Sequence, residues 1–221
     1  MRVTARSAAT RRDPARTRER ILTQATAEFA LKGYESARVE AIARRGRVSK
    51  NMLYHYFDSK EGLFVAVLER CYARFRARQR DLALPLADPE AALRQLAAHT
   101  FDALLENPQV IALLNVENLH QGRHIARSAR LRDLYDPLLQ MLREVLDRGA
   151  ALGVLRADID PATLYVSMSS LAYHYISNQY TLKAALGIDF TAPDRRDAWR
   201  RHITDMIANF CRPEPAAALK D

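Results

Sequence analysis

The sequence predicts an all-α protein made of a small N-terminal domain and a larger C-terminal helical bundle. Three observations lead to this prediction. Apolar residues recur at the i, i+3, i+4 spacing of amphipathic helices along most of the chain. Prolines and glycines fall between these stretches, at positions where helices begin and end. No segment alternates apolar and polar residues between turn signals as a strand would, and no internal repeat is present.

Residues 39–57, VEAIARRGRVSKNMLYHYF, predict two short helices separated by a tight turn. Val39 and Ile42 keep helical spacing, so one face of the first helix can pack inward. Residues 46–48 interrupt the pattern, and Ser49 is a good N-cap for the second helix. This is the pattern of a helix-turn-helix, a motif whose second helix can enter a major groove of DNA.

Further helix signals flank this motif. Asp13 is an N-cap for a first helix, and Gly33 supplies its C-terminal stop. Ser36 is expected to cap the following helix. Asp58 is expected to begin a fourth helix, with Glu61 completing a capping box. The fourth helix continues to about residue 80 and is long enough to link two domains, so its movement would re-aim the helix-turn-helix.

The larger domain follows a loop with two prolines, DLALPLADPE at residues 81–90, which we take as the domain boundary. The predicted helices of this domain run from Asp88–Pro89 to Leu105, from Pro108 to Leu119, over 125–149, from Asp160–Pro161 to about Leu186, and from Pro193 to about Cys211. Pro137 must kink or restart the third of these, with Asp136 as a plausible N-cap. The predicted organisation is a basic arm at 1–13, a helix-turn-helix domain with its linking helix at 14–80, a C-terminal domain at 81–212 and a tail at 213–221.

Charge is unevenly placed along the chain. The whole sequence carries 34 Lys+Arg and 26 Asp+Glu, a net charge of +8. Residues 1–80 hold 19 Lys+Arg against 8 Asp+Glu, a net charge of +11. This asymmetry favours a module that binds a polyanion, with nucleic acid as the first candidate, over a basic face that is only solvated. The four arginines of residues 1–12 belong either to an arm that reaches DNA or to a tail without function.

Other classes of protein find little support in the residues. Cys71 and Cys211 match no metal-ligand spacing and indicate a reducing compartment, with buried packing favoured over a redox role. The N-terminus lacks the apolar segment of a secretory signal, and no apolar run could span a bilayer, so we expect a soluble cytoplasmic protein without membrane contact. Neither a Gly-rich phosphate loop nor a nucleophile elbow is present, so we expect no catalytic residue, cofactor or metal.

Four segments carry a family resemblance: TRERIL at 17–22, FALKGY at 29–34, IA at 42–43 and VSKNMLYHYFDSKE at 48–61. In this order and spacing they resemble the DNA-binding domain of the TetR family of transcriptional regulators. The resemblance implies a homodimeric repressor that binds a palindromic operator, with half-sites about 34–36 Å apart, and that a small-molecule effector releases. The alternative is a constitutive DNA-binding regulator that has no effector and works through a protein partner.

The resemblance also assigns roles around the second helix of the motif. By position, the groove-facing candidates for base contact are Lys50, Asn51, Met52 and His55. Lys can donate to guanine, Asn can pair with adenine, and Met can touch a thymine methyl group. The expected phosphate contacts are Ser49, Tyr54, Tyr56 and Lys60, with Arg38 able to replace a Thr or Ser that the family often has early in the preceding helix. One of the two tyrosines could instead pack inward, and Leu53 and Phe57 are read as core.

The turn departs from the family pattern. The family commonly has glycine at the position of Arg47, whereas this chain has the order Gly46–Arg47. If Arg47 adopts the left-handed conformation, it costs roughly 1 kcal/mol. The alternative is that the turn is shifted onto Gly46.

In this family the C-terminal body dimerises, usually through its last two helices, and encloses an effector pocket. The expected interface residues are Met168, Tyr175, Trp199, Ile203, Met206, Ile207 and Phe210, which could otherwise pack against their own chain. Polar and aromatic residues inside apolar helices are the pocket candidates: Phe101, Asn115, Asn118, Tyr165, Tyr173, His174 and Asn178. Each could also be an ordinary core or interface group. Glu117, His120 and His124 have the spacing of metal ligands, but a solvated polar turn is the favoured interpretation.

Overall fold

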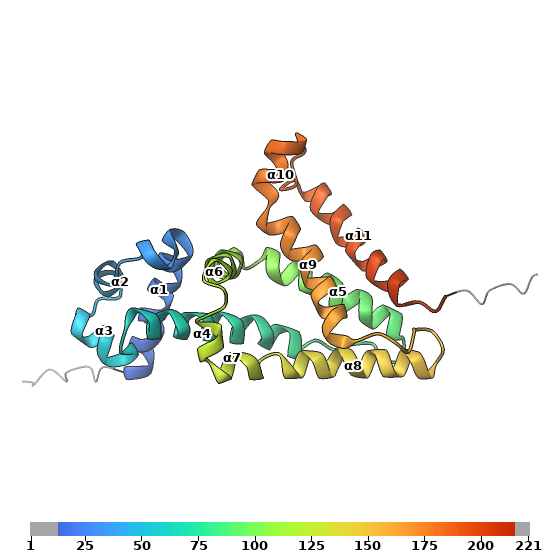
Figure 1. Cartoon of the computed structure of the whole chain (residues 1–221), viewed down its shortest axis with the longest axis horizontal. Coiled ribbons are helices and arrows are strands. Elements are labelled where there is room, and N and C mark those ends of the chain that lie inside the picture. The colour runs from blue at the N-terminus through green and yellow to red at the C-terminus, as the bar shows by residue number, and fades with distance from the viewer. Residues whose placement is uncertain (1–12, 215–221) are drawn as a thin grey trace, which may run out of the picture. The chain divides into compact units, whose positions relative to one another are not determined.

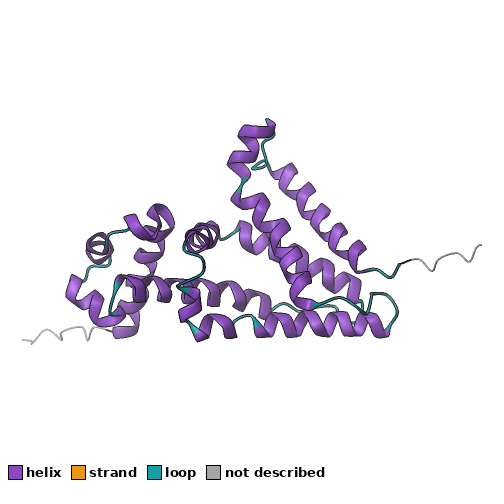
Figure 2. Ribbon diagram, viewed as in Figure 1, coloured by secondary structure: helices purple, strands orange, loops and turns teal. Residues whose placement is uncertain are grey.

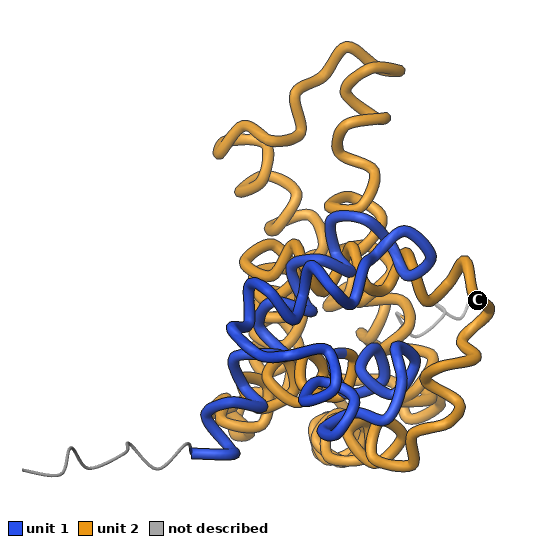
Figure 3. Tube along the Cα trace, turned by 90° about the vertical axis from the view of Figure 1, so that its left-hand side faces the viewer, with its two compact units in different colours: residues 1–67 blue, residues 68–221 orange. Residues whose placement is uncertain are grey.

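The computed structural model describes residues 13–214. All regular structure in that stretch is helical (Figure 2), which confirms the predicted all-α class. The chain forms two compact units, Met1–Val67 and Leu68–Asp221 (Figure 3). The basic arm at 1–12 and residues 215–221 of the tail lie outside the described residues, and the expectations for them stay predictions.

The first unit contains the helix-turn-helix. Its helices are α1 (Pro14–Ser36), α2 (Val39–Arg45), α3 (Lys50–Phe57) and the beginning of α4 (Lys60–Arg80), as labelled in Figure 1. The unit buries one apolar core, formed by Ile21, Leu22, Ala25, Phe29, Ile42, Leu53, Phe57, Leu63 and Phe64. Leu53 and Phe57 are therefore core residues of α3, as predicted.

Phe29 lies in this core as part of an aromatic cluster. Its ring meets Phe64 edge to face, with centroids 4.9 Å apart and planes at 69°. Tyr34 stacks on Phe29 with centroids 6.1 Å apart. Aromatic pairs in these geometries contribute about 0.5–1.5 kcal/mol beyond their burial, so the cluster joins α1 to the start of α4.

The first helix begins and breaks where the sequence predicts. The Asp13 carboxylate accepts a hydrogen bond from the backbone N–H of Ala15 at 3.0 Å, as an N-cap does. The helix is assigned through Ser36, but Gly33 departs from helical geometry with φ of 73° and ψ of 176°. A positive φ of this kind is why glycine occupies that position.

Two predicted N-caps in the first unit were wrong. Ser36 is the last residue of α1, and Arg38 takes the N-cap of α2 without a side-chain capping bond. Before α4, the Ser59 hydroxyl accepts the Gly62 N–H at 2.9 Å. Asp58, with φ of 59°, ends α3 instead. Because Asp58 is used to terminate one helix, capping of the next falls to the following serine.

The second unit contains the rest of α4 and all later helices. These are α5 (Pro89–Leu105), α6 (Pro108–Leu119), the short 3₁₀ helix η1 (Ile125–Arg127), α7 (Ala129–Asp133), α8 (Asp136–Ala151), α9 (Pro161–Ser177), α10 (Gln179–Leu186) and α11 (Pro193–Cys211). The compact units thus divide inside α4, whereas the domain boundary predicted at residue 80 coincides with the end of that helix. Within the described residues, no helix is both long and apolar enough to cross a membrane.

Helix α5 is central to the second unit, because it packs against α8, α9 and α11. Its buried face carries Leu93, Leu96, Ala97, Phe101 and Leu104. At the surface, Arg200 of α11 donates twice to the carboxylate of Asp102 on α5, from Nε at 2.9 Å and from Nη2 at 2.8 Å. A bidentate pair of this kind adds geometric specificity, so it sets the register of α11 on α5.

Two predicted long helices are interrupted. The stretch 125–149 restarts near Pro137 as predicted. The predicted N-cap at Asp136 was wrong, because Asp136 is the first residue of α8 and Tyr135 takes the N-cap position. The helix predicted through Leu186 breaks at Asn178, which has non-helical φ of −105° and ψ of 8°. The Asn178 side-chain amide donates to the His174 carbonyl at 3.0 Å. Asparagine competes in this way for helix carbonyls, and the break separates α9 from α10.

Candidate nucleic-acid interface and ligand cavity

The turn of the motif is built around Gly46 and Arg47. Gly46 is helical, with φ of −73°, whereas Arg47 takes the left-handed conformation, with φ of 52°. The strained residue is therefore Arg47, at a cost of about 1 kcal/mol. Gly46 is needed for close approach instead, because an added Cβ would lie 3.1 Å from the Ile42 carbonyl oxygen. Arg20 Nε donates to the Gly46 carbonyl at 2.7 Å and holds the turn against α1.

A buried carboxylate that the sequence reasoning missed ties the motif together. Glu28 of α1 is fully buried. Its oxygens accept hydrogen bonds from Lys32 Nζ at 2.8 Å, Arg45 Nη1 at 2.7 Å and the backbone N–H of Arg38 at 3.4 Å. Burial opposes ionisation of Glu28, but these hydrogen bonds outweigh it and lower the pKa. Helix α2 is thereby held at both ends by one side chain of α1.

The four candidates for base contact differ in their surroundings. Asn51 and His55 are exposed on α3, and Met52 is half-buried. Lys50 is exposed but paired, with its Nζ 2.6 Å from Glu40 Oε1 of α2. The Lys50 Nζ also lies 5.8 Å from the centroid of the Tyr54 ring. Asn51 and His55 are thus presented to solvent, whereas Lys50 must leave a carboxylate to reach a base.

The five candidates for phosphate contact are mostly engaged within the unit. The Ser49 hydroxyl caps α3 by accepting the Met52 N–H at 3.1 Å. Lys60 Nζ donates to the Glu35 carbonyl at 3.0 Å and lies over the Tyr34 ring. Tyr54 and Tyr56 are half-buried, and Arg38 is exposed. The Ser49 cap confirms the predicted start of α3, while the DNA contacts of these residues stay predictions.

A cavity of about 250 Å³ lies among α4, α5, α6 and α9 in the second unit. Three of the seven predicted pocket residues line it: Asn118, Tyr165 and Tyr173. The aromatic residues Tyr72, Phe75 and Tyr135 complete much of its wall and were not predicted. The signal that could have found two of them is the spacing of Tyr72 and Phe75, which lie about one helical turn apart on α4. Burial raises the pKa values of Tyr72 and Tyr165, so both phenols stay neutral.

The other four predicted pocket residues lie elsewhere. Phe101 is buried in the core, where its ring meets Tyr175 at 5.8 Å. Asn115 is hydrogen-bonded to Tyr173 and Ser177. His174 is exposed, and Asn178 bonds to it at the break after α9. These four do not line this cavity, and their assignment to an effector pocket stays a prediction.

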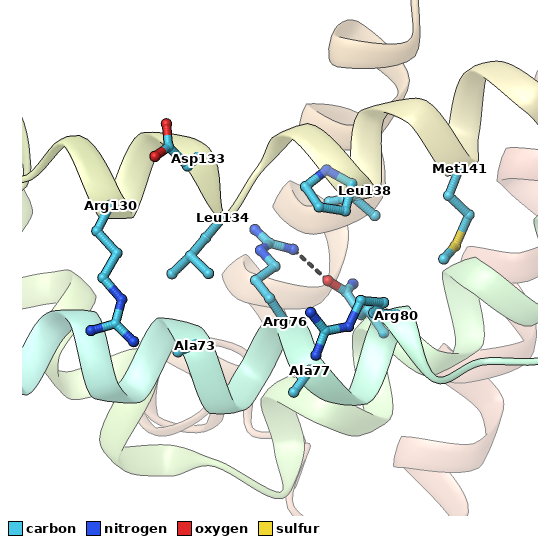
Figure 4. A pocket seen from close by; sticks show the side chains of 11 residues that line it. Ala73, Arg76, Ala77, Arg80, Arg130, Asp133, Leu134, Leu138 and Met141 are labelled. Carbon is cyan, nitrogen blue, oxygen red and sulfur yellow. Dashed lines mark hydrogen bonds between the residues drawn. The ribbon is translucent and has the colours of Figure 1, made fainter.

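Arg76 of α4 is the second functional candidate that sequence reasoning missed. It lines the 250 Å³ cavity and also a neighbouring cavity of about 360 Å³, which α4 forms with α7 and α8. Figure 4 shows the Arg76 side chain rising from α4 toward α7 and α8, bonded to Gln79. Only 6% of the Arg76 surface is exposed. Arg76 is therefore an inward-facing residue of α4, unlike the exposed Arg74, Arg78 and Arg80 on the same helix.

Glu117 and His124 form a buried pair. His124 Nδ1 lies 2.7 Å from Glu117 Oε2, and Glu117 Oε1 accepts the backbone N–H groups of His124 and Ile125. Both side chains are almost fully buried, so the expected solvated polar turn was wrong. In the described chain, no group of three potential metal ligands is found. The pair instead satisfies the backbone of the loop that follows α6.

The predicted interface residues divide into two groups. Met168, Tyr175, Ile203 and Ile207 are buried in the core of their own chain, and Trp199 stacks on Tyr175 with centroids 5.1 Å apart. Four of these side chains are covered by their own chain, whereas Trp199 is half-buried, and the interface assignment of all five stays a prediction. Met206 and Phe210 are 44% and 49% exposed on α11 and remain candidates.

The two cysteines also differ. Cys211 is fully buried, and burial raises the pKa of its thiol to about 11. The group therefore stays protonated and acts as an apolar core residue. Cys71 is half-buried on α4.

A helix-turn-helix with an exposed second helix, in a chain whose helical body contains a cavity, defines a DNA-binding transcriptional regulator. Residues 21–67 match the family described as bacterial regulatory proteins, tetR family. Residues 89–207 match the family described as tetracyclin repressor-like, C-terminal domain. The chain belongs to the TetR family of bacterial transcriptional regulators.

Named relatives support this assignment. The HTH-type transcriptional repressor NicS of Pseudomonas putida is 38% identical over 197 residues, covering 89% of this chain and 93% of that protein. The repressor SCO4008 of Streptomyces coelicolor is 28% identical over 162 residues, covering 73% of this chain and 80% of its own. Both relatives are named as transcriptional repressors.

Solved structures share the fold. The transcriptional regulator SCO4942 of Streptomyces coelicolor superposes with a TM-score of 0.66 and 27% identity, over 90% of this chain and 99% of that chain. FadR of Bacillus subtilis, solved in complex with stearoyl-CoA, superposes with a TM-score of 0.62 and 15% identity, over 88% and 99%. The second similarity concerns the fold alone.

Proposed function

We propose that this chain is a homodimeric repressor that binds a palindromic operator and is released from it by a small-molecule effector. Residues 14–80 form the DNA-binding domain with its linking helix, and residues 81–212 carry ligand binding and dimerisation. The effector cavity lies within the second unit and includes residues of the linking helix. The observation that carries the proposal is the surface of α3, where Asn51 and His55 are exposed. The helix before it, α2, is held by the Glu28 hydrogen bonds. The named relatives are repressors, which supports repression over activation as the mode of regulation.

Few side chains determine which operator sequence is recognised. Asn51 and His55 contact base edges, with Lys50 and Met52 beside them, because hydrogen bonds in the major groove specify sequence. Ser49, Tyr54, Tyr56, Lys60 and Arg38 contact phosphates and set the register of the protein on DNA. The exposed arginines of the turn, Arg44, Arg45 and Arg47, add affinity without sequence preference.

Dimerisation is supported by apolar surface at one end of the second unit. None of the α10 side chains is buried within the chain, and Tyr180 is 73% and Leu186 58% exposed. In Figure 1, α10 lies between α9 and α11 at the end of that unit. Met206 and Phe210 of α11 add further exposed apolar area. Exposed apolar surface on consecutive helices indicates a partner surface, and a second copy is the partner that a palindromic operator requires.

The cavity supports release by an effector over constitutive binding. A chain that works without an effector has no need of a 250 Å³ cavity lined by tyrosines and an arginine. A ligand in that cavity lowers operator affinity by its differential affinity for the bound and released conformations.

Selection from a randomised duplex library tests the DNA-binding claim. The purified chain is expected to select one palindrome, with half-sites on successive major grooves, and to bind it as a dimer. Binding that depends on salt but shows no sequence preference would contradict the proposal.

Two variants test the assigned roles on the selected operator. Asn51→Ala is expected to relax base preference at one position of each half-site, with a loss of about 1–3 kcal/mol on the best sequence. Lys60→Ala is expected to weaken all sequences alike and to flatten the salt dependence. Equal effects of the two substitutions on sequence preference would contradict the roles.

A further inference from the structure

Arg76 is a buried cation without an anionic partner. Its Nη1 donates to Gln79 Oε1 and its Nη2 to the Tyr165 hydroxyl, both at 2.5 Å. Both acceptors are neutral. Among residues 13–214, no carboxylate lies within ion-pair distance of this guanidinium, although α4 carries other arginines that form ion pairs, such as Arg78 with Glu106.

Two buried donors at this place have no acceptor. Arg76 Nε and Gln79 Nε2 are both buried and make no hydrogen bond within the described chain. Gln79 is 2% exposed and lines the neighbouring 360 Å³ cavity, whereas Arg76 lines both cavities. A buried charge is costly unless it is paired, and an unsatisfied buried donor adds to that cost. The unpaired charge of Arg76 is explained if a ligand supplies the anion and an acceptor for its guanidinium.

The residues around Arg76 indicate the chemical character of the uncharged part of that ligand. The guanidinium carbon lies 4.4 Å from the centroid of the Tyr135 ring and 4.9 Å from that of the Tyr165 ring. Arg76 is the only charged side chain that lines the 250 Å³ cavity in the described structure. Ligand cavities commonly measure about 300–1,000 Å³, so this one takes a small molecule, and its aromatic walls suit a flat apolar body.

We propose that the effector is a small aromatic monocarboxylate, whose carboxylate is bound by Arg76 and whose ring lies in the cavity lined by Tyr72, Phe75, Tyr135 and Tyr165. A single guanidinium matches one carboxylate, because its planar donors can face two acceptor oxygens. A phosphate dianion would need more positive charge than this cavity offers. The assignment of the ligand as an effector rests on the proposed repressor function; its chemical class rests on the cavity.

Calorimetric titration of the full-length chain, without DNA, tests the class of ligand. The probes are benzoate, phenylacetate and cinnamate, each paired with its neutral amide. At least one acid is expected to bind about tenfold or more tightly than its amide, since the charged hydrogen bonds to Arg76 are lost in the amide. If no acid of the three binds more tightly than its amide, the proposal is overturned.

Variants locate the site. Arg76→Gln is expected to weaken the best acid by about tenfold or more while changing the matched amide by less than about twofold. Arg80→Gln removes the same charge from the same helix, but Arg80 is exposed and lines only the neighbouring cavity, so it is expected to leave both affinities unchanged. Ser169→Leu fills the smaller cavity and is expected to weaken acid and amide alike. Equal losses in Arg76→Gln and Arg80→Gln would overturn the assignment, and far-ultraviolet circular dichroism of each variant establishes that it is folded.

Release from DNA is measured separately on the selected operator. If the acid binds through Arg76 but the chain selects no operator, the repressor function fails while the ligand class stands. If the chain selects a palindrome but no acid is preferred over its amide, the ligand class fails while the repressor function stands.

Discussion

Lys50 of the recognition helix is held by Glu40 of the preceding helix, with Nζ and Oε1 2.6 Å apart. The hydrogen bond between them raises the pKa of Lys50 and lowers that of Glu40, and both side chains are exposed. A carboxylate beside the first residue of α3 repels phosphate and occupies a lysine that could otherwise donate to a base. Lys50 therefore contacts DNA only where that contact is more favourable than its ion pair with Glu40.

Glu40→Gln is accordingly expected to strengthen DNA binding. Without the carboxylate, Lys50 is free to contact DNA, which adds about one phosphate-equivalent to the salt dependence. We expect affinity to rise several-fold on operator and non-specific DNA, measured by fluorescence anisotropy across a salt series. Glu144→Gln removes the same charge from an exposed position on α8 and serves as the control. Unchanged or weaker binding by the Glu40 variant would show that the pair does not restrain Lys50.

Arg47→Gly is expected to stabilise the chain while weakening DNA binding. The left-handed conformation of Arg47 is relieved in glycine, which is expected to raise the free energy of unfolding by up to about 1 kcal/mol. Arg47→Ala removes the same charge but keeps the strain, so only the glycine variant should gain stability. Urea denaturation of the three proteins decides this, and equal midpoints for the two variants would mean that the turn is not strained.

Glu28→Gln is expected to destabilise the first unit by about 2 kcal/mol, because a buried carboxylate with three donors is replaced by an amide that accepts at only one oxygen. Lys32→Met removes one partner whose side chain is partly exposed and should cost less than about 1 kcal/mol. Thermal unfolding followed by circular dichroism compares the two. A Glu28→Gln effect no larger than that of Lys32→Met would contradict the role of Glu28.

The Glu28 contribution also depends on pH. Its folded-state pKa is lowered, so the stabilisation is fully present above the unfolded value of about 4.3 and is lost as the pH falls through the lower folded value. The difference in stability between the wild type and Glu28→Gln is therefore expected to shrink on acidification below about pH 4.5. A difference that grows toward low pH would have the wrong sign for this account.

Gly62→Ala is expected to destabilise the chain although it lies inside a helix. Helix propensity alone favours alanine over glycine by about 1 kcal/mol. An added Cβ at Gly62, however, would lie 2.3 Å from the Phe57 carbonyl oxygen, a backbone atom that cannot move away cheaply. We expect a lower melting temperature for the variant. A higher one would mean that α3 and α4 can separate at this point without cost.

Tyr180→Glu is expected to shift the chain from dimer toward monomer, because it puts a charge on the exposed apolar surface of α10. Leu119→Glu makes a comparable change at another exposed apolar residue, at the end of α6, and is expected to have no effect. Light scattering coupled to size-exclusion chromatography gives the mass of each. Equal behaviour of the two variants would exclude α10 from the interface.

Local sequence signals predicted most of the helices. Periodicity and caps predicted the starts of α3, α5 and α9, where Ser49, Asp88 and Asp160 each accept a backbone hydrogen bond from the first turn. Prediction was weaker where several polar residues compete for one role. Asp58 and Ser59 are adjacent candidates for one cap, and only the left-handed backbone of Asp58 decides between them.

Burial of polar residues could not be predicted, because it depends on contacts between distant segments. Glu28 and Arg76 have ordinary positions on amphipathic helices, and their partners lie up to 17 and 89 residues away in sequence. The same dependence on distant contacts applies to the residues predicted for the dimer interface. An apolar stripe on α11 indicates that the stripe is covered, but not whether α5 of the same chain or a second chain covers it.

The central claim is that two copies of the chain read two half-sites together. Its most direct test compares the selected operator with one that carries five additional base pairs between its half-sites. Five base pairs are about half a helical turn, so the second half-site moves to the opposite face of the duplex. We predict that the dimer loses at least about 100-fold in affinity on the lengthened operator. Equal affinity for the two duplexes would mean that each chain binds DNA alone, and would contradict the account.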